Sequence, residues 1–384
     1  MRKKILILIA ILIAAGLGFL AGRSGWSEKS GDWFEKSDNG SISIGVLVPL
    51  TGAAASYGQN SQRGAELALQ EFRAANPSVK VRLQVEDSRG EASVGVNAAQ
   101  KLVEIDGVTA VMGDVTSGVT LAVAPLMNER KIPLVSPGAS APKVSDAGDF
   151  VFRTWPSDTF EAGAIATYIK NAKFKKKLAI LRVNNEYGMA MEAALRSQLG
   201  SDVKISLAES FDQGTRDLRT QLLKIKKSGA GALFFIGFPE AAVVLGSSYS
   251  AVGLSLPIFA TSGFEDPQVP EKTGGVLNGT IYAKPLAQSV ASGTFKENYK
   301  KSFGIDAGIT SDTAYDATML ILKAVASAIA SNHSVTGETI RDYLLHVRDY
   351  VGASGVLSFD ANGDVVKPIG LFSLRDGHYE ELPQ

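Results

Sequence analysis

The sequence has no cysteine among its 384 residues. This absence excludes disulfides, thiolate metal sites and a cysteine nucleophile. Histidine is also scarce, and His333, His346 and His378 do not have the spacing of a metal site. We therefore expect neither a bound metal nor a cofactor.

A net charge is lacking as well, because 39 Lys and Arg residues balance 39 Asp and Glu residues. Proteins that bind nucleic acid usually carry a basic excess, so a nucleic-acid partner is not expected. The 45% share of apolar residues is typical of a globular protein, and the length suits two domains.

The N-terminus carries an export signal. Basic residues at positions 2–4 precede an uncharged run over 5–22. A lipoprotein would have its lipidated cysteine at position 23, where this chain has Arg23. Residues 1–23 are therefore either a cleaved signal or a retained membrane anchor. The run is close to the roughly 17 residues that a membrane span needs, which favours the anchor. Residues 24–41 then form a polar tether, and the rest of the chain works outside the cytoplasmic membrane, in a periplasmic or other extracytoplasmic position.

From residue 41 onward, short apolar runs alternate with longer amphipathic segments. Such alternation predicts parallel sheets with helices on both faces, and two successive series predict two doubly wound lobes. Ligands of such sheets bind at the carboxyl ends of the strands. The predicted strands are 42–49, 79–86, 108–112, 131–135, 178–183, 203–209, 232–236 and 257–260.

The C-terminal third follows another pattern. Residues 311–330 and 340–346 read as helices, and 356–359 and 369–374 read as strands of a hairpin around a turn at 360–364. This tail is too irregular to form a parallel domain of its own. We expect it to complete the two earlier lobes, so that the chain crosses between them more than once.

Several motifs, taken in order, resemble the leucine/isoleucine/valine-binding branch of the type I periplasmic binding proteins, and the resemblance spans residues 42–374. No single motif is specific, whereas their order and spacing together are. The motifs lie at 44–52, 56–58, 63–68, 86–88, 113–117, 135–142, 152–153 with 156–158, and 185–188.

The resemblance implies an α/β fold of two Rossmann-like lobes joined by a three-strand hinge. Lobe 1 is expected over 42–157 plus 286–350, and lobe 2 over 158–285 plus 351–384. It also implies a solute-binding protein, expected to be a monomer, that closes on a small ligand and delivers it to an ABC permease.

An amino-acid ligand needs partners for its carboxylate and its ammonium, because burying either one unpaired is costly. Ser117 stands where it could cap a helix and offer its hydroxyl and N–H, and a capping serine without a ligand is the alternative. The resemblance makes Ser117 a carboxylate ligand. It also implies that the Gly138 carbonyl accepts from the ammonium and that Ser140 binds the carboxylate; a plain Pro-Gly turn is the alternative there.

Aromatic residues are candidates for the cleft walls. Tyr57 and Tyr187 match ligand contacts of the resembling family, and Phe238 matches with a one-residue gap. Ordinary core packing is the alternative for each of them.

The acid that pairs with the ammonium in that family has no direct counterpart. Alignment puts Gly263 at its position, and Glu265 and Asp266 follow closely. Glu265 is the predicted contact, whereas Asp266 before Pro267 could equally cap a helix. If neither acid reaches the ligand, the ligand lacks an ammonium and is an amide, a urea or a carboxylic acid.

The predicted function is therefore capture of an amino-acid-like ligand, with a branched-chain or other apolar amino acid favoured. The alternative is a membrane-tethered receptor that senses an amide or a carboxylic acid. An enzyme is not expected, because the P-loop, the nucleophile elbow and GxGxxG after a strand are all missing.

Overall fold

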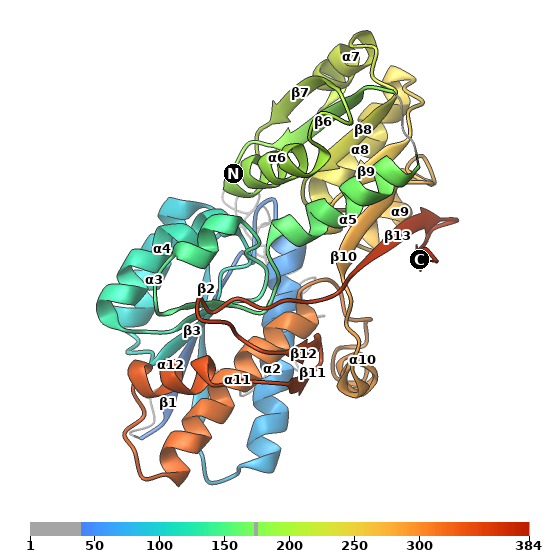
Figure 1. Cartoon of the computed structure of the whole chain (residues 1–384). Coiled ribbons are helices and arrows are strands. Elements are labelled where there is room, and N and C mark those ends of the chain that lie inside the picture. Colours follow the sequence, from blue (N-terminus) through green and yellow to red (C-terminus); the bar gives the residue numbers. More distant parts are fainter. Residues whose placement is uncertain (1–39, 173–175, 384) are drawn as a thin grey trace, which may run out of the picture. The chain divides into compact units, whose positions relative to one another are not determined.

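The computed structural model describes residues 40–172 and 176–383, which are organised around two β-sheets with helices on their faces (Figure 1). The predicted signal or anchor over 1–23, and all but the end of the predicted tether, lie outside the described residues. Below, the first lobe is the five-stranded sheet with the helices that pack on it, and the second lobe is the seven-stranded sheet with its helices.

The first sheet is entirely parallel, with the strand order β2-β1-β3-β4-β5. Its strands are β1 (Ile42–Val48), β2 (Val81–Asp87), β3 (Ala110–Gly113), β4 (Leu134–Ser136) and β5 (Val151–Arg153). Strand β1 lies inside the sheet and is buried on both faces, which explains why its sequence is largely apolar. The first lobe also holds α2 (Ala55–Ala75), α3 (Ala92–Glu104), α4 (Ser117–Arg130) and the 3-10 helix η2 (Pro142–Asp146).

The second sheet has the order β14-β13-β10-β9-β8-β6-β7, with two antiparallel strands at one edge. Its strands are β6 (Leu178–Val183), β7 (Ile205–Phe211), β8 (Ala232–Ile236), β9 (Ile258–Ala260), β10 (Ile281–Pro285), β13 (Ile369–Arg375) and β14 (His378–Glu381). Its helices are α5 (Asp158–Asn171), α6 (Glu186–Leu199), α7 (Arg219–Lys227), α8 (Pro239–Val252), η3 (Ser262–Phe264) and α9 (Gln268–Thr273).

The parallel parts of the two sheets share one topology. Counted within each lobe, the five parallel strands lie in the order 2-1-3-4-5. The order reverses between β1 and β3 in the first sheet and between β6 and β8 in the second. Doubly wound sheets bind ligands beside such reversals, at the carboxyl ends of their strands. The prediction of two doubly wound lobes is confirmed.

Three connections link the lobes, as the three-strand hinge requires. The chain leaves the first sheet after β5, returns after β10, and enters the second sheet again at β13. Between the last two passages it forms α10 (Val290–Phe303), α11 (Ser311–Ala330), α12 (Gly337–Leu345), β11 (Tyr350–Gly352) and β12 (Gly355–Leu357).

The predicted C-terminal hairpin is wrong. Strand β12 pairs with β11, whereas β13 pairs with β10 and β14. Only an isolated bridge between Phe359 and Val365 spans the expected turn. Residues 353–364 contact the first lobe, since Ala353 donates to Asp316 and Asp364 pairs with Arg153. The residue boundaries of the lobes stay a prediction.

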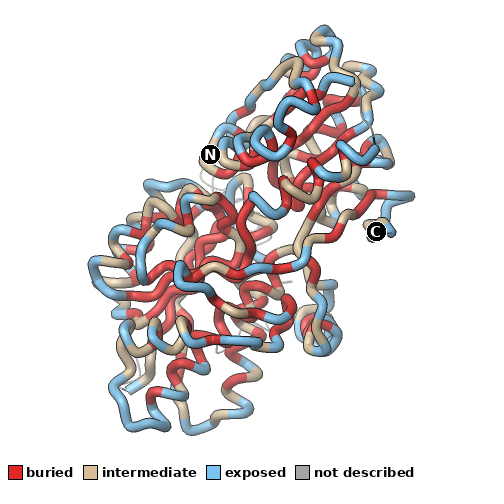
Figure 2. The backbone as a smooth tube through the Cα atoms, in the orientation of Figure 1, coloured by how far each residue is buried: buried red, intermediate tan, exposed pale blue. Residues whose placement is uncertain are grey.

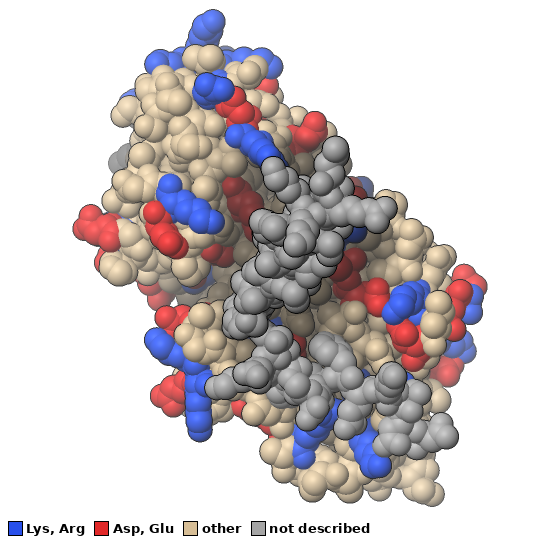
Figure 3. All heavy atoms as spheres, turned by 180° about the vertical axis from the view of Figure 1, so that it is seen from behind, with Lys and Arg blue, Asp and Glu red and all other residues tan. Residues whose placement is uncertain are grey.

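Burial follows the layers of the fold, with buried strands and exposed outer helix faces (Figure 2). Helix α11 has the length and apolarity to cross a membrane, but 67% of its most apolar window is buried inside the protein, against α2 and other elements. We therefore assign it to the core of the first lobe. On the face drawn in Figure 3, acidic and basic side chains are both scattered over the surface, in keeping with the zero net charge.

Candidate ligand-binding site

A cavity of about 380 Å³, counted up to its open mouth, lies at the carboxyl ends of strands from both sheets. Its first-lobe wall is Tyr57, Val115, Thr116, Ser117, Gly138, Ser140, Trp155 and Thr310. Its second-lobe wall is Tyr187, Phe238, Ser262 and Gly263. The structure thus brings together six of the seven predicted site residues, all except Glu265.

The loop after β3 is organised by a buried carboxylate. Asp114 accepts hydrogen bonds from the Ser88 hydroxyl and from the N–H and hydroxyl of Thr116, both at 2.7 Å. Burial raises the pKa of Asp114 to about 6, against these hydrogen bonds, which lower it. The network places Thr116 and Ser117 at the cavity, where α4 begins.

The capping alternative for Ser117 is not seen, because α4 begins at Ser117 itself and Thr116 precedes it. Its hydroxyl instead accepts from the N–H groups of Ser140, at 3.2 Å, and Ala141, at 3.1 Å. The Ser117 hydroxyl therefore joins the loops after β3 and β4. The Thr120 N–H bonds within the helix to Thr116, so the N–H groups ahead of it are the ones that the helix leaves without an intrahelical acceptor.

The loop after β4 is held by Ser136. Its hydroxyl donates to the Asp114 carbonyl, at 2.6 Å, and accepts from the Ala139 N–H, at 2.9 Å. Gly138 lies so close to the neighbouring loop that a Cβ atom there would stand 2.8 Å from the Val115 carbonyl oxygen. Glycine is therefore required at this position of the cavity wall.

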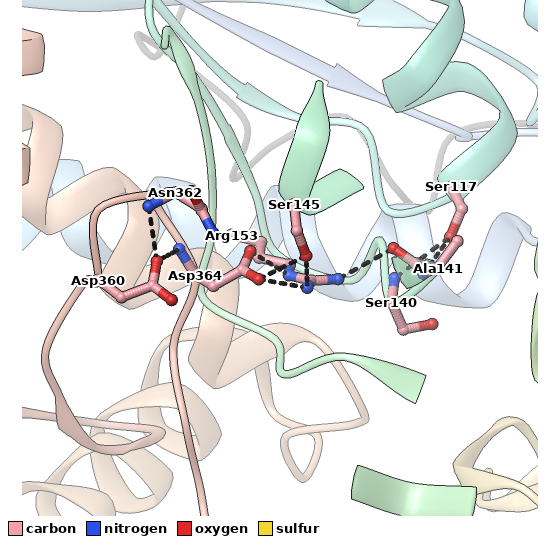
Figure 4. Close-up of polar contacts among 8 residues, drawn as sticks. All are labelled: Ser117, Ser140, Ala141, Ser145, Arg153, Asp360, Asn362 and Asp364. Carbon is pink, nitrogen blue, oxygen red and sulfur yellow. Dashed lines mark hydrogen bonds and ion pairs between the residues drawn. The ribbon is translucent and has the colours of Figure 1, made fainter. Parts of the chain in front are cut away.

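Arg153 supports the same loop from behind, as Figure 4 shows. The guanidinium is fully buried and makes a bidentate pair with Asp364, with both N–O distances 2.7 Å. It also donates to the Ala141 carbonyl, at 3.1 Å, and to the Ser145 hydroxyl, at 2.8 Å. The tail of the chain thus stabilises the loop that carries Ser140.

Aromatic rings face one another across the cavity. The Phe238 ring lies edge-on to Tyr57, with centroids 5.9 Å apart, and 5.6 Å from the ring of Tyr187. Tyr57 lies in the first turn of α2 and donates to the Ser262 carbonyl of the second lobe, at 3.4 Å. Tyr187 donates to the Thr261 hydroxyl, at 2.7 Å. These rings form an apolar enclosure whose polar tips are already bonded.

Glu265 lies elsewhere. Its carboxylate pairs with Lys284 and accepts from the Tyr282 hydroxyl, and it is not among the residues that line the cavity. Asp266 accepts from the Gln268 N–H, at 2.9 Å, at the start of α9, but the N-cap of that helix is Pro267, so Asp266 is not its N-cap. Gly263 does line the cavity, but a Cβ atom there would stand 2.0 Å from the Gly237 carbonyl oxygen, which excludes an acid at this position.

Other cavity residues escaped the sequence analysis. Thr310 has a left-handed backbone, with φ 71°, and its hydroxyl donates to the Tyr57 carbonyl, at 2.9 Å. No sequence signal marks it, because a non-glycine residue seldom adopts this conformation. Trp155 and Ser262 also line the cavity, and Ser262 directly precedes Gly263, yet only the fold turns them toward it.

Two buried acids stand in the first turn of α5, just after the first hinge connection. Burial raises the pKa of Asp158 to about 7 and that of Glu161 to about 8. The Asp158 carboxylate has no hydrogen bond of good geometry, although the Ser140 hydroxyl lies near enough to lower its pKa somewhat. Over 40–172 and 176–383, no cluster of three or more His, Cys, Asp or Glu residues could hold a metal ion.

Comparison with known proteins identifies the family. The family model described as "Periplasmic binding protein" matches residues 41–378, so the chain belongs to that family. It is 27% identical over 344 residues to Leu/Ile/Val-binding protein homolog 3 of Brucella melitensis, covering 88% of this chain and 92% of the relative.

Solved structures share the fold. One is the substrate-binding protein of a branched-chain amino acid transporter from Streptococcus pneumoniae, in complex with isoleucine, with a TM-score of 0.80, 23% identity and coverage of 89% and 99% of the two chains. Another is a solute-binding protein of an ABC transporter from R. palustris, in complex with 4-hydroxybenzoate, with a TM-score of 0.79, 20% identity and coverage of 89% and 95%. The family match and the shared fold together make the protein a periplasmic binding protein with the type I fold.

Proposed function

We propose that this protein captures a small apolar amino acid, with branched-chain side chains favoured, and presents it to the permease of an ABC importer. The observation that carries the proposal is the single cavity that gathers Ser117, Gly138 and Ser140 on one wall and aromatic rings on the other. The first set suits a carboxylate and an ammonium, and the second suits an apolar side chain.

Every candidate residue except Glu265 has a role in this proposal. The ligand's carboxylate is received by the N-terminal N–H groups of α4 and the hydroxyls of Ser117 and Ser140. The Gly138 carbonyl accepts from the ammonium. Tyr57, Tyr187 and Phe238 enclose the side chain. Glu265 is left out, because its carboxylate is paired with Lys284. The names of the Brucella relative and of the isoleucine complex support this ligand class.

A second candidate is a receptor or transporter component for a carboxylic acid or amide without an ammonium. The position of Glu265 away from the cavity favours it, and so does the neighbour that binds 4-hydroxybenzoate. In either case we propose a monomer without enzymatic activity, tethered to the outer face of the cytoplasmic membrane by residues 5–22.

A thermal-shift screen of the full-length protein in a non-ionic detergent tests the proposal. A ligand that binds only the folded state raises the melting temperature with its concentration relative to its Kd. We expect leucine, isoleucine and valine to raise it, and Ser117→Ala to abolish the shift. A rise with 4-hydroxybenzoate or amides alone would support the second candidate instead.

A further inference from the structure

Glu161 is a buried acid without a cation. It is 4% exposed, and its two carboxylate oxygens accept from the N–H and, at 3.1 Å, from the hydroxyl of Ser262. Buried carboxylates in proteins are normally paired with a positive group. Among the described residues, no Lys, Arg or His forms an ion pair with Glu161.

Ser262 connects this acid to the cavity. Ser262 lines the second-lobe wall, on the loop after β9, beside the Gly263 position where the resembling family would place its acid. The Ser262 hydroxyl donates to Glu161, so its own lone pairs are left to accept. A donor in the cavity could therefore bond to Ser262 and be stabilised by the charge of Glu161 behind it.

The surroundings of the cavity are rich in acids. Asp158 lies near enough to Glu161 to raise its pKa, and Glu240 and Asp266, together with Glu161, raise the pKa of Tyr57. The basic group that acts on Asp158 is Arg153, and its guanidinium is already held by Asp364. Four acids thus surround an aromatic cavity, and a cationic group on the ligand would relieve their mutual repulsion.

We propose that Glu161, acting through Ser262, is the counter-charge for the ligand's ammonium group, in place of Glu265. This inference rests on the proposed function and narrows it to ligands that carry a primary ammonium next to a carboxylate. Ser262 is the contact, and Glu161 is the positioning residue that supplies the charge. When the ammonium binds, the proton on the Glu161 carboxyl group leaves to solvent, and a carboxylate bonded to Ser262 faces the cation.

This proton release gives a direct readout. The pKa of Glu161 is raised to about 8 by burial, so at pH 7 the group is mostly protonated in the empty protein. Calorimetric titration with L-leucine at pH 7, in phosphate and in Tris, should show release of about 0.5–1 proton. Affinity should fall up to about tenfold per pH unit below pH 8. Asp158, Tyr57 and Tyr187 also face this region, and the two phenols stay neutral over the same range.

The Glu161→Gln variant distinguishes a role of Glu161 from a role of its neighbour Asp158. The amide keeps the size of the side chain and an acceptor for the Ser262 N–H, but it has no charge. We expect about 10- to 100-fold weaker leucine binding, no proton release from this position and an unchanged or higher Tm. Glu265→Gln is the matched control, because that acid already pairs with Lys284, and it should change the Kd by less than about twofold. Glu161→Asp should restore proton release in part.

The outcomes distinguish the two proposals. Leucine binding that is equally tight in Glu161→Gln, with the same proton release, would overturn the role of Glu161 and leave the proposed function standing. Binding of 4-hydroxybenzoate without any binding of amino acids would overturn both. If Glu265→Gln lost affinity for leucine and Glu161→Gln did not, the ammonium would pair with Glu265, the acid that the sequence analysis predicted.

Discussion

The two walls of the cavity differ in the chemical groups that they present to a ligand. On the first-lobe wall, Ser117 and Ser136 link the loops after β3 and β4 through hydrogen bonds of 2.6, 3.1 and 3.2 Å, which fix the relative positions of the two loops. On the second-lobe wall, the rings of Tyr187 and Phe238 stand in front of buried carboxyl groups. Hydrogen bonds are directional, whereas apolar contact is not. The first wall therefore suits the constant part of a ligand, and the second suits its variable part.

The largest expected effect concerns the support of the first wall. Arg153→Ala would leave Asp364 without its bidentate partner and the Ala141 carbonyl without its donor. Breaking a buried pair in this way costs about 3–5 kcal/mol of stability, which urea denaturation followed by circular dichroism would measure. Glu338→Gln, in an exposed pair with Lys131, is the control and should cost less than about 1 kcal/mol. If Arg153→Ala lost no more stability than Glu338→Gln, the first-lobe wall would not depend on the pair between Arg153 and Asp364.

A smaller effect is expected when the link within the first wall is removed. Ser117→Ala leaves the buried N–H groups of Ser140 and Ala141 without their acceptor, at a cost of about 1–3 kcal/mol. The same denaturation experiment applies. Ser247→Ala, which removes an exposed hydroxyl from the second lobe, serves as the reference. Equal stability of the two variants would show that the wall is not preorganised by Ser117.

The pH dependence of stability tests the buried acids behind both walls. Burial raises the folded-state pKa values of Asp114, Asp158 and Glu161 to about 6, 7 and 8, well above the ordinary values of these carboxyl groups. The folded protein therefore binds more protons than the unfolded chain, so the contribution to stability is complete below about pH 4 and is lost as the pH rises through these folded values. We therefore expect the free energy of unfolding of the protein to fall between pH 5.5 and 8.5.

Urea midpoints at three pH values would measure this slope, and Glu161→Gln should flatten its upper part. Stability that instead rises between pH 5.5 and 8.5 would mean that these acids are ionised in the folded protein.

The smallest effect is expected at the aromatic wall. Phe238→Leu keeps an apolar side chain but removes the ring contacts with Tyr57 and Tyr187, which are worth about 0.5–1.5 kcal/mol. Because apolar contact tolerates such changes, leucine binding should weaken several-fold without being lost. Calorimetric Kd values for Phe238→Leu and for the exposed control Phe160→Leu would measure the difference. Complete loss of leucine binding would show that the second-lobe wall tolerates substitution no better than the first-lobe wall.

Much of the fold could be predicted because its signals are local. Apolar runs such as Ile42–Val48 alternate with amphipathic helices, and this periodicity depends only on neighbouring residues. The C-terminal hairpin failed because strand pairing is a long-range property. Residues 356–359 and 369–374 have the right composition, but β13 finds better partners in β10 and β14.

The residues of the candidate site show the same contrast between local and long-range determinants. Strand ends can be located in a sequence, so Ser117, Gly138 and Ser140 were found, whereas the direction of a side chain at the end of a strand depends on what packs behind it. Glu265 turned to Lys284 because the strand β10 brought that cation beside it. Thr310 and Ser262 reached the cavity through loops distant in sequence from the motifs of the first lobe.

The sequence by itself determined the order of strands and helices, the two doubly wound lobes and the strand-end loops that form the cavity, because these follow from short-range periodicity and turn chemistry. Only the tertiary structure decided which acid stands behind the cavity. Two acids close in sequence to the expected position, Glu265 and Asp266, bond elsewhere, whereas Glu161 from the hinge helix α5 reaches Ser262 across 101 positions of sequence. A buried charge is placed by the packing of distant elements, and that packing leaves no local pattern in the sequence.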